Sequence, residues 1–268
     1  MRGKFKYIMM FLLCAAFSAA EVFAGEQTYY VGTEAAYAPF NYVGEDGKVD
    51  GYDIAVVRAL DELIPEAAFD FVPTEWSSIF IALESGKYDA IASTIGRTEE
   101  REKKYLYAQE PYLYMANAII TKGGRTDIKG VSDLHGKTVA LGIGTANTLA
   151  LEEYNDDNGK PINIVYTDGE LSKTLQEIIN GRADAFLANP VAVTKFTREQ
   201  GLDVEINIWK ERGVEPIYLL FANNENGKKL KLLTDAALAT LKSNGKLVEL
   251  SNQYLGGNYT DKEALLGE

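Results

Sequence analysis

The sequence predicts an α/β fold of two lobes, each a mostly parallel sheet flanked by helices, joined by crossing hinge strands. β-rich segments alternate with segments whose apolar residues recur at helical spacing, as in parallel sheets covered on both faces. Residues 86–91 (GKYDAI) end a helix and open a strand, and residues 181–186 (GRADAF) repeat that pattern. The 268 residues suffice for two modest domains.

The elements of the first lobe begin with a β-rich strand and a loop. Behind Asp53, which is placed to cap a helix, apolar residues recur at helical spacing up to Ile64. Glycines at positions 86 and 181 stand where the end of a helix favours a left-handed residue. The predicted strands and loops are strand 26–32, loop 33–40, turn 45–48 and strands 69–72, 90–92, 138–141 and 217–221. The other predicted helices are 78–85, one from about 147, a long one through 230–241 and 247–255.

The segment 89–101 (DAIASTIGRTEER) combines a strand end with a helix start. After the strand, small residues expose hydroxyl and backbone N–H groups, and Thr98 is a good N-cap for the helix that follows. Arg101 lies one turn into that helix, and a guanidinium binds a carboxylate through two parallel hydrogen bonds. The segment is therefore a candidate carboxylate site, and the alternative is an arginine paired only with solvent.

The charge and the N-terminus limit where the protein works. A net charge of -12 repels nucleic acid and anionic membranes, so we expect no nucleic-acid partner. Residues 1–24 have the layout of a secretory signal peptide, and their apolar segment is shorter than the roughly 20 residues that span a bilayer. Cleavage after Ala24 would remove Cys14, the single cysteine, and a lipid-modified Cys14 is the minor alternative. We therefore expect a soluble protein exported to the periplasm.

The chain is poor in groups that catalysis uses. His135, the sole histidine, lies in a polar turn, where we expect it to be solvated. Without a second histidine or a mature cysteine, Cys–His catalysis and histidine-rich metal sites are excluded. Carboxylate acid–base chemistry stays open, but no spacing singles out a pair. We therefore predict no catalytic residue, no metal site and no cofactor.

Two further features favour a small ligand. The turn 142–144 is rich in glycine and feeds a helix, whose N–H groups and dipole favour a small anion, although the third glycine of a dinucleotide fingerprint is absent. Tyr37 and Trp76 precede the first two helices, at the strand edge where ligands gather in α/β sheets. The alternatives are a structural turn and core aromatic residues.

Several segments resemble the polar-amino-acid solute-binding proteins of ABC importers. They are VGTEAAYAPFNYVGEDGKVDGYDI, DAIASTIGRTEER, GKTVALGIGTANT, GRADAF and NGKLVELSNQYLG, which span essentially the whole mature chain. The resemblance implies the type II periplasmic binding protein fold, which closes around an amino acid by hinge motion. It implies a first lobe at residues 25–119 and 218–268, and a second lobe at 120–217.

The resemblance also implies roles for particular residues. Arg101 would clamp the ligand α-carboxylate. Ser93 and Thr94 would contribute backbone and hydroxyl contacts, and Thr145 and Ala146 would add N–H groups from the helix start of the second lobe. Gly96 and Asn189 complete the predicted ligand-binding residues. Tyr37 and Trp76 would stack on the ligand side chain, and Glu34 would face its polar end. The partners implied are an amino acid or related carboxylate and the membrane permease of an ABC importer, with the protein as a monomer.

Two positions depart from the family pattern. Gly96 stands where many members have a serine or threonine that touches the carboxylate. Asn189 stands where the family places an aspartate for the α-ammonium, and an amide brings no charge, although charge-assisted bonds are roughly twice as strong as neutral ones. We therefore expect either an ammonium held elsewhere, such as by Glu34, or an unusual ligand.

The altered ammonium site leaves an enzyme as the second hypothesis. A few proteins of this fold are exported cyclohexadienyl dehydratases that act on prephenate or arogenate. In that case Glu177, in the helix before the second repeat, would be the acid to test. A sensory role, in which bound ligand is presented to a receptor, is a third hypothesis that the sequence does not separate from transport.

Overall fold

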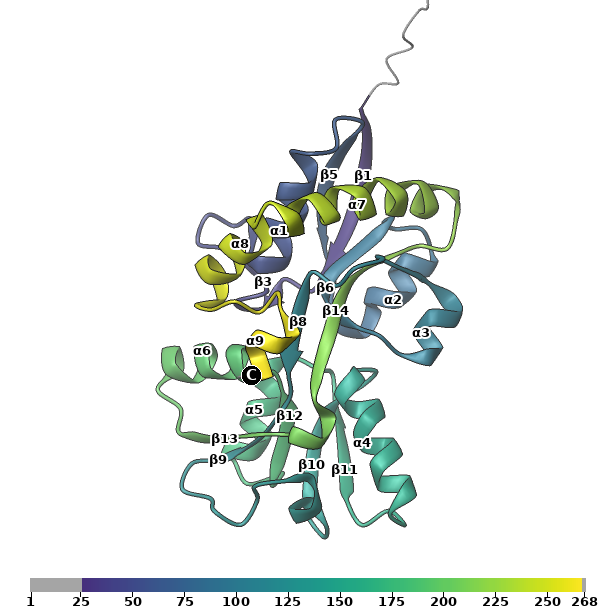
Figure 1. Cartoon of the computed structure of the whole chain (residues 1–268). Coiled ribbons are helices and arrows are strands. Elements are labelled where there is room, and N and C mark those ends of the chain that lie inside the picture. The colour runs from purple at the N-terminus through teal and green to yellow at the C-terminus, as the bar shows by residue number, and fades with distance from the viewer. Residues whose placement is uncertain (1–25, 267–268) are drawn as a thin grey trace, which may run out of the picture.

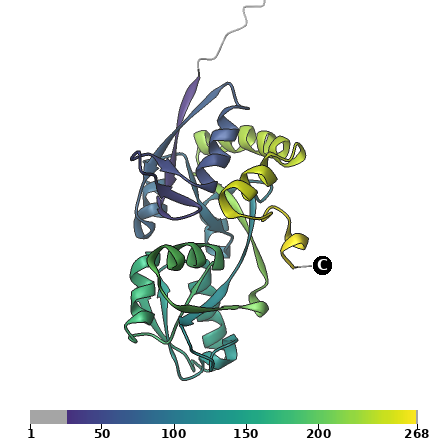
Figure 2. The same ribbon diagram turned by 90° about the vertical axis from the view of Figure 1, so that its left-hand side faces the viewer.

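The computed structural model describes residues 26–266, and the predicted signal peptide at residues 1–24 lies outside the described residues. Two large sheets, each with helices on its faces, form two lobes, one above the other in Figure 1. The same two lobes are seen in the perpendicular view of Figure 2. The predicted two-lobed α/β fold is confirmed.

The sheet of the first lobe has the strand order β5-β1-β6-β14-β7, with β8 also paired to β14. Strand β1 runs parallel to β5 and β6, whereas β14 runs antiparallel to its neighbours. The strands are β1 (Gln27–Thr33), β5 (Ala67–Pro73), β6 (Ala90–Gly96), β7 (Leu106–Tyr107), β8 (Leu113–Ala116) and β14 (Val214–Phe221). A small separate sheet joins β2 (Ala36–Tyr37), β3 (Asn41–Val43) and β4 (Val49–Asp50).

Helices cover both faces of this sheet because its central strand is apolar on both sides. In β6, Ala90 and Ala92 belong to the core cluster of α1 and α7, while Ile91 and Ile95 pack with the residues of α2. Alternate residues of a strand face opposite sides of its sheet, which explains this division. The helices are α1 (Tyr52–Asp61), α2 (Trp76–Glu84), α3 (Glu99–Lys104), α7 (Glu225–Ser243), α8 (Lys246–Leu255) and α9 (Lys262–Leu266).

The sheet of the second lobe has the order β11-β10-β12-β9-β13, with β10 parallel to β11 and β12. Ala185 and Leu187 of β12 face the core cluster that includes Leu151 of α4, and Phe186 and Ala188 face the cluster of α5. The elements are β9 (Ala118–Lys122), β10 (Thr138–Gly142), α4 (Ala146–Asp157), β11 (Asn163–Thr167), α5 (Leu171–Ile179), β12 (Ala185–Ala188), α6 (Pro190–Gln200) and β13 (Val204–Ile208), with 3-10 turns η1 (Val131–Leu134) and η2 (Lys210–Arg212).

The repeated segments occupy equivalent places in the two lobes. Gly86 and Gly181 follow α2 and α5 with φ of 75° and 73°, as a left-handed helix end requires. The aspartate of each repeat accepts a backbone N–H from the neighbouring strand: Asp89 from Tyr30 at 3.0 Å and Asp184 from Thr138 at 2.7 Å. The internal similarity of the sequence therefore marks one structural unit used twice.

The chain crosses between the lobes twice, from β8 to β9 and from β13 through η2 to β14, as Figure 1 shows. Two local predictions were wrong. Strand β6 continues to Gly96 instead of ending at residue 92, because its last residues pair with Ile217 and Tyr218 of β14. Helix α1 begins after Gly51, and the carboxylate of Asp53 binds side chains instead of capping the helix.

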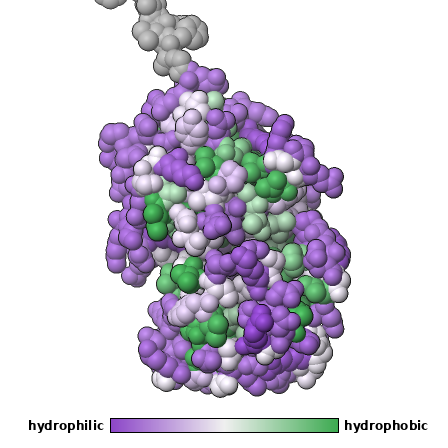
Figure 3. Space-filling view, turned by 180° about the vertical axis from the view of Figure 1, so that it is seen from behind, coloured by the Kyte–Doolittle hydropathy of each residue, from purple (hydrophilic) through white to green (hydrophobic). Residues whose placement is uncertain are grey.

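The surface seen from behind in Figure 3 is largely hydrophilic, in keeping with the charged composition. Among residues 26–266, no helix combines the length and the apolar character needed to cross a membrane.

Candidate ligand-binding pocket

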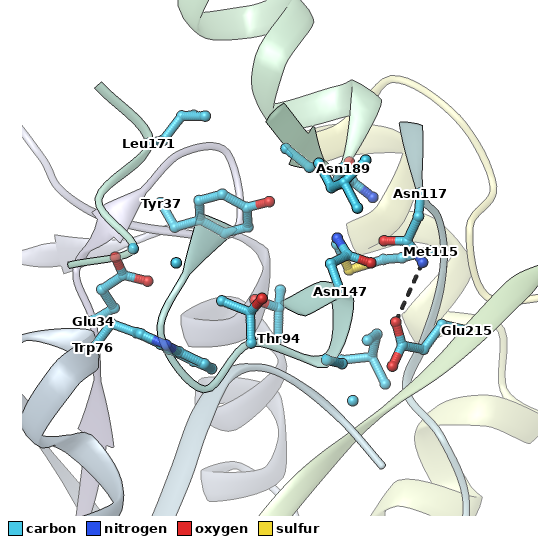
Figure 4. Close-up of a pocket in the computed structure, with 18 of the residues that line it drawn as sticks. Glu34, Tyr37, Trp76, Thr94, Met115, Asn117, Asn147, Leu171, Asn189 and Glu215 are labelled. Carbon is cyan, nitrogen blue, oxygen red and sulfur yellow. Dashed lines mark hydrogen bonds between the residues drawn. The ribbon is translucent and has the colours of Figure 1, made fainter. Parts of the chain in front are cut away.

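A pocket lies between the two lobes and encloses about 780 Å³, part of it open to solvent. Figure 4 shows side chains from both lobes turned toward it. All the predicted site residues except Ser93 line this pocket, namely Glu34, Tyr37, Trp76, Thr94, Gly96, Arg101, Thr145, Ala146 and Asn189. Segments far apart in the chain thus meet at one pocket.

Arg101 is held at the pocket from both lobes. The side chain of Thr98 accepts the backbone N–H of Arg101 at 3.2 Å, which confirms Thr98 as the N-cap of α3. The Arg101 guanidinium donates to the Gly96 carbonyl at 2.9 Å and, across the lobes, to the Gly144 carbonyl at 2.7 Å. It also lies 4.5 Å from the ring centroid of Phe80. Arg101 is therefore buried, not paired with solvent, and adjoins the glycine turn.

Trp76 forms a second link between the lobes. Its indole N–H donates to the Ile143 carbonyl at 3.0 Å, and its ring packs edge-on against Phe80. Trp76 is the first residue of α2, so the helix fixes its direction. Both cross-lobe hydrogen bonds end on the glycine turn that follows β10, which brings that turn against the first lobe.

Glu34 gives the pocket an acid whose charge depends on pH. The hydroxyl of Ser93 accepts the backbone N–H of Glu34 at 3.1 Å, so Ser93 positions Glu34 from behind instead of lining the pocket. Burial, together with the nearby carboxylates of Glu170 and Asp168, raises the pKa of Glu34 to about 7. A positively charged ligand group near Glu34 would stabilise its ionised form and lower this pKa.

A buried polar cluster supports this side of the pocket. Asp53 accepts hydrogen bonds from the amide of Asn41 at 2.8 Å and the hydroxyl of Tyr112 at 2.7 Å. The side-chain oxygen of Asn41 accepts the backbone N–H of Ala35, which follows Glu34. Burial raises the pKa of Asp53 to about 7. The loop that carries Glu34 is thereby tied to α1 and to the segment before β8.

The start of α4 supplies the second lobe's part of the pocket. Thr145 caps the helix by accepting the backbone N–H of Thr148 at 3.0 Å, and Thr148 donates its hydroxyl to the Gly142 carbonyl. Thr145 and Ala146 lie at the positive end of a helix of 12 residues. This arrangement suits an anion.

The structure explains why Asn189 is a poor acceptor for a ligand. Its side-chain oxygen accepts the backbone N–H groups of Val191 at 2.8 Å and Ala192 at 3.4 Å, which caps α6. Its amide donates to the carbonyl of Ala116, the last residue of β8, at 3.2 Å. Asn189 lines the pocket, but its acceptor already serves the helix.

Several lining residues were missed by the sequence analysis, and they come from the crossing strands and the second lobe. Glu215 of β14 is joined to Asn117 by a hydrogen bond of 3.3 Å, drawn dashed in Figure 4. No local motif marks Met115 or Glu215, which the pairing of β14 with β8 brings opposite each other. The residues concerned include Met115, Asn117, Asn147, Leu171, Phe186 and Glu215.

Two residues considered for chemistry lie elsewhere. His135 is exposed, as predicted, and its ring nitrogen lies 3.0 Å from the Tyr154 hydroxyl. Glu177 forms a bidentate ion pair with Arg182 at 2.7 and 2.8 Å and does not line the pocket. In the described part of the chain, no three histidine, cysteine or acidic side chains gather as metal ligands.

Comparison with known proteins identifies close relatives of this chain. Residues 29–257 match the family model described as bacterial extracellular solute-binding proteins, family 3. The L-cystine-binding protein TcyJ of Bacillus subtilis is 33% identical over 240 residues, which cover 87% of this chain and 86% of that protein. The L-cystine-binding protein TcyK of the same organism is 30% identical over 237 residues, covering 88% and 87% of the two chains.

Similarity extends to solved structures. One comes from work on glutathione import in Gram-positive bacteria via GshT and the cystine ABC importer TcyBC of Streptococcus mutans. It superposes on this chain with a TM-score of 0.81 at 28% identity, and covers 89% of this chain and 99% of that one.

Proposed function

The chain belongs to family 3 of the bacterial extracellular solute-binding proteins, and from this we propose that it captures an amino acid between its lobes and delivers it to an ABC-type permease. The observation that carries the proposal is the position of Arg101. A buried guanidinium contacts both lobes at the pocket, beside the helix start at Thr145. A guanidinium has five N–H donors, so the two carbonyl bonds leave it able to grip a carboxylate.

We propose L-cystine as the first ligand to test. The relatives TcyJ and TcyK are named for L-cystine binding. Cystine carries an ammonium group at each end, and Figure 4 shows two acids, Glu34 and Glu215, on opposite sides of the pocket. Opposite charges at matching positions favour such a ligand over one with a single ammonium.

The protein is a binding protein and not an enzyme, because its relatives are named as binding proteins. In the alternative hypothesis of a dehydratase, Glu177 is the acid to test. That residue is paired with Arg182 away from the pocket, which gives the dehydratase no support.

Calorimetry on the mature chain tests the proposal. L-cystine and the common amino acids would each be titrated into the wild-type protein. We expect binding of L-cystine or another amino acid, accompanied by a rise in Tm, since a ligand at a hundredfold excess over Kd stabilises by roughly 2.7 kcal/mol. No heat and no Tm shift with any of them would overturn the proposed function.

Arg101→Ala and His135→Ala form the matched pair for this test. Arg101→Ala removes the proposed carboxylate clamp, so we expect binding to weaken by at least about a hundredfold, or roughly 2.7 kcal/mol. His135 is exposed on the second lobe, so His135→Ala should bind as the wild type does. If the two variants bound the ligand with equal affinity, Arg101 would not contribute to ligand binding.

The finer points of export and domain organisation belong to the same proposal. We infer that the leader is cleaved after Ala24 and that the mature protein works as a monomer in the periplasm. We also infer that residues 25–119 with 218–268, and residues 120–217, move as the two lobes. N-terminal sequencing of the exported protein checks the cleavage site.

A further inference from the structure

We propose that Glu215 and Asn147 accept the α-ammonium of the bound ligand, in place of an acid at position 189. The inference rests on the proposed function and adds the group that would select an α-amino acid over a simple carboxylate. Asn189 leaves this task open, because its side-chain oxygen caps α6.

Strand β14 directs Glu215 into the pocket. Glu215 pairs across the strands with Met115 and stands two residues before Ile217, so the alternation of β14 puts Glu215 and Ile217 on one face. Met115, Glu215 and Ile217 all line the pocket. The Glu215 side chain is 12% exposed. Its carboxylate is therefore held inside the site by the crossing strand itself.

The absence of a side chain at Gly96 makes room for this carboxylate. A Cβ atom at Gly96 would lie 2.1 Å from Glu215 Oε1 and 2.8 Å from its Cδ, closer than any real contact. Gly96 pairs with Ile217, so a residue with a side chain there would meet Glu215 directly. The glycine at position 96 and the glutamate at 215 thus form a complementary pair. This pair accounts for both departures from the family pattern.

Asn147 provides a second hydrogen-bond acceptor for the ligand ammonium. Its Oδ1 is buried and makes no hydrogen bond within residues 26–266. A buried polar atom without a partner is costly, and a ligand ammonium would satisfy it. Figure 4 draws Asn147, Asn117 and Glu215 together on the side of the pocket away from Glu34. An ammonium has three N–H donors to share among such acceptors.

The existing partners of Glu215 leave capacity for a ligand. Its oxygens accept one bond each from Asn117 and Arg212, both at 3.3 Å, which is long for a charged pair. An ionised carboxylate offers about four acceptor positions. Arg212 therefore positions and partly balances Glu215 without using up its acceptors. The alternative is that Glu215 serves only as the structural partner of Arg212.

Binding of two related ligands to Glu215→Gln separates these roles. L-cystine, or the amino acid that binds most tightly, is compared with its analogue that lacks the ammonium groups; for cystine this is dithiodipropionate. We expect the wild type to prefer the amino acid strongly. Glu215→Gln should weaken amino-acid binding by about 10- to 100-fold and leave the analogue nearly unchanged. The matched control is Glu211→Gln, which removes an exposed acid from the neighbouring turn η2.

Gly96→Ala tests the same point without removing a charge. The added methyl should displace the Glu215 carboxylate and weaken amino-acid binding at least severalfold, with little further loss when Glu215 is already alanine. Tm without ligand reports whether each variant folds. If the wild type binds an amino acid and Glu215→Gln keeps the full preference over the analogue, this inference is wrong and the receptor function stands. If the wild type binds no amino acid, both fall.

Discussion

At the scale of single residues, Glu34 links the pocket to pH. Its pKa is raised to about 7 by burial and by neighbouring carboxylates, so it is largely neutral at pH 5.5 and largely charged at pH 8. The charged form attracts a second ammonium group. We therefore expect the affinity for a diamino ligand such as L-cystine to rise as pH increases from 5.5 to 8.

Glu34→Gln isolates this effect. The amide keeps the shape of the side chain but does not titrate, so the affinity of the variant should vary less over the same pH range. Calorimetry at several pH values measures both proteins. An identical pH dependence in the wild type and in Glu34→Gln would show that another group titrates.

Asp53 contributes to the stability of the folded protein. It accepts hydrogen bonds from Asn41 and Tyr112, and replacing it by alanine would strand both donors in the core. We expect Asp53→Ala to lower the free energy of unfolding by about 2–4 kcal/mol, measured by urea denaturation. Asp70→Ala, at an exposed position of β5, is the control and should change it by less than about 0.5 kcal/mol.

The raised pKa of Asp53 also fixes a direction with pH. Between the unfolded value of 3.8 and the folded value of about 7, the folded chain binds more protons than the unfolded chain. The contribution of Asp53 to the free energy of unfolding therefore falls as pH rises through this window.

At the scale of elements, the short helix α3 depends on its cap. Thr98 accepts the backbone N–H of Arg101, which lies in the first turn of a helix of only six residues. Thr98→Ala should cost about 0.5–2 kcal/mol of stability and weaken ligand binding, because the direction of Arg101 is set by this turn. Thr98→Ser should restore both. Unchanged Kd in a destabilised Thr98→Ala protein would contradict the link between cap and clamp.

Many of the turns and helix caps could be predicted from the local sequence. The repeated glycine and aspartate at 86–89 and 181–184, the cap at Thr98 and the glycine turn after β10 each have a local physical cause, and the structure has them as predicted. The end of β6 was not predictable in this way. Its hydroxyl and glycine residues favour a turn, but pairing with β14, more than a hundred residues later, extends the strand to Gly96.

The position of Glu215 in the pocket also could not be predicted from local sequence. Residues at strand ends and helix starts could be chosen from sequence because their chemistry is local. Glu215 lines the pocket only because β14 crosses between the lobes beside β8, which no spacing in the sequence reveals. The two departures at Gly96 and Asn189 were visible in the sequence, yet their common cause lay in this crossing strand.

At the scale of the whole molecule, two hydrogen bonds link the lobes beside the pocket. Trp76 donates one to the Ile143 carbonyl, and Arg101 donates the other to the Gly144 carbonyl. Trp76→Phe keeps an aromatic ring against Phe80 but removes the N–H bond to the Ile143 carbonyl. A net hydrogen bond is worth about 0.5–1.5 kcal/mol, so we expect ligand dissociation to be roughly 2- to 12-fold faster. Stopped-flow measurement of the dissociation rate checks this, and Phe80→Leu, which keeps the indole donor, is the comparison. A dissociation rate unaffected by Trp76→Phe would mean that this bond does not restrain opening.

In the function that we propose, both lobes grip one amino acid in the pocket between them. A crystal structure of the mature protein with L-cystine, or with the amino acid that binds most tightly, measures this most directly. We predict that the ligand carboxylate lies within hydrogen-bond distance of the Arg101 guanidinium and of the backbone N–H groups at Thr145 and Ala146. A ligand bound outside this pocket, or inside it without contact to Arg101, would contradict the account.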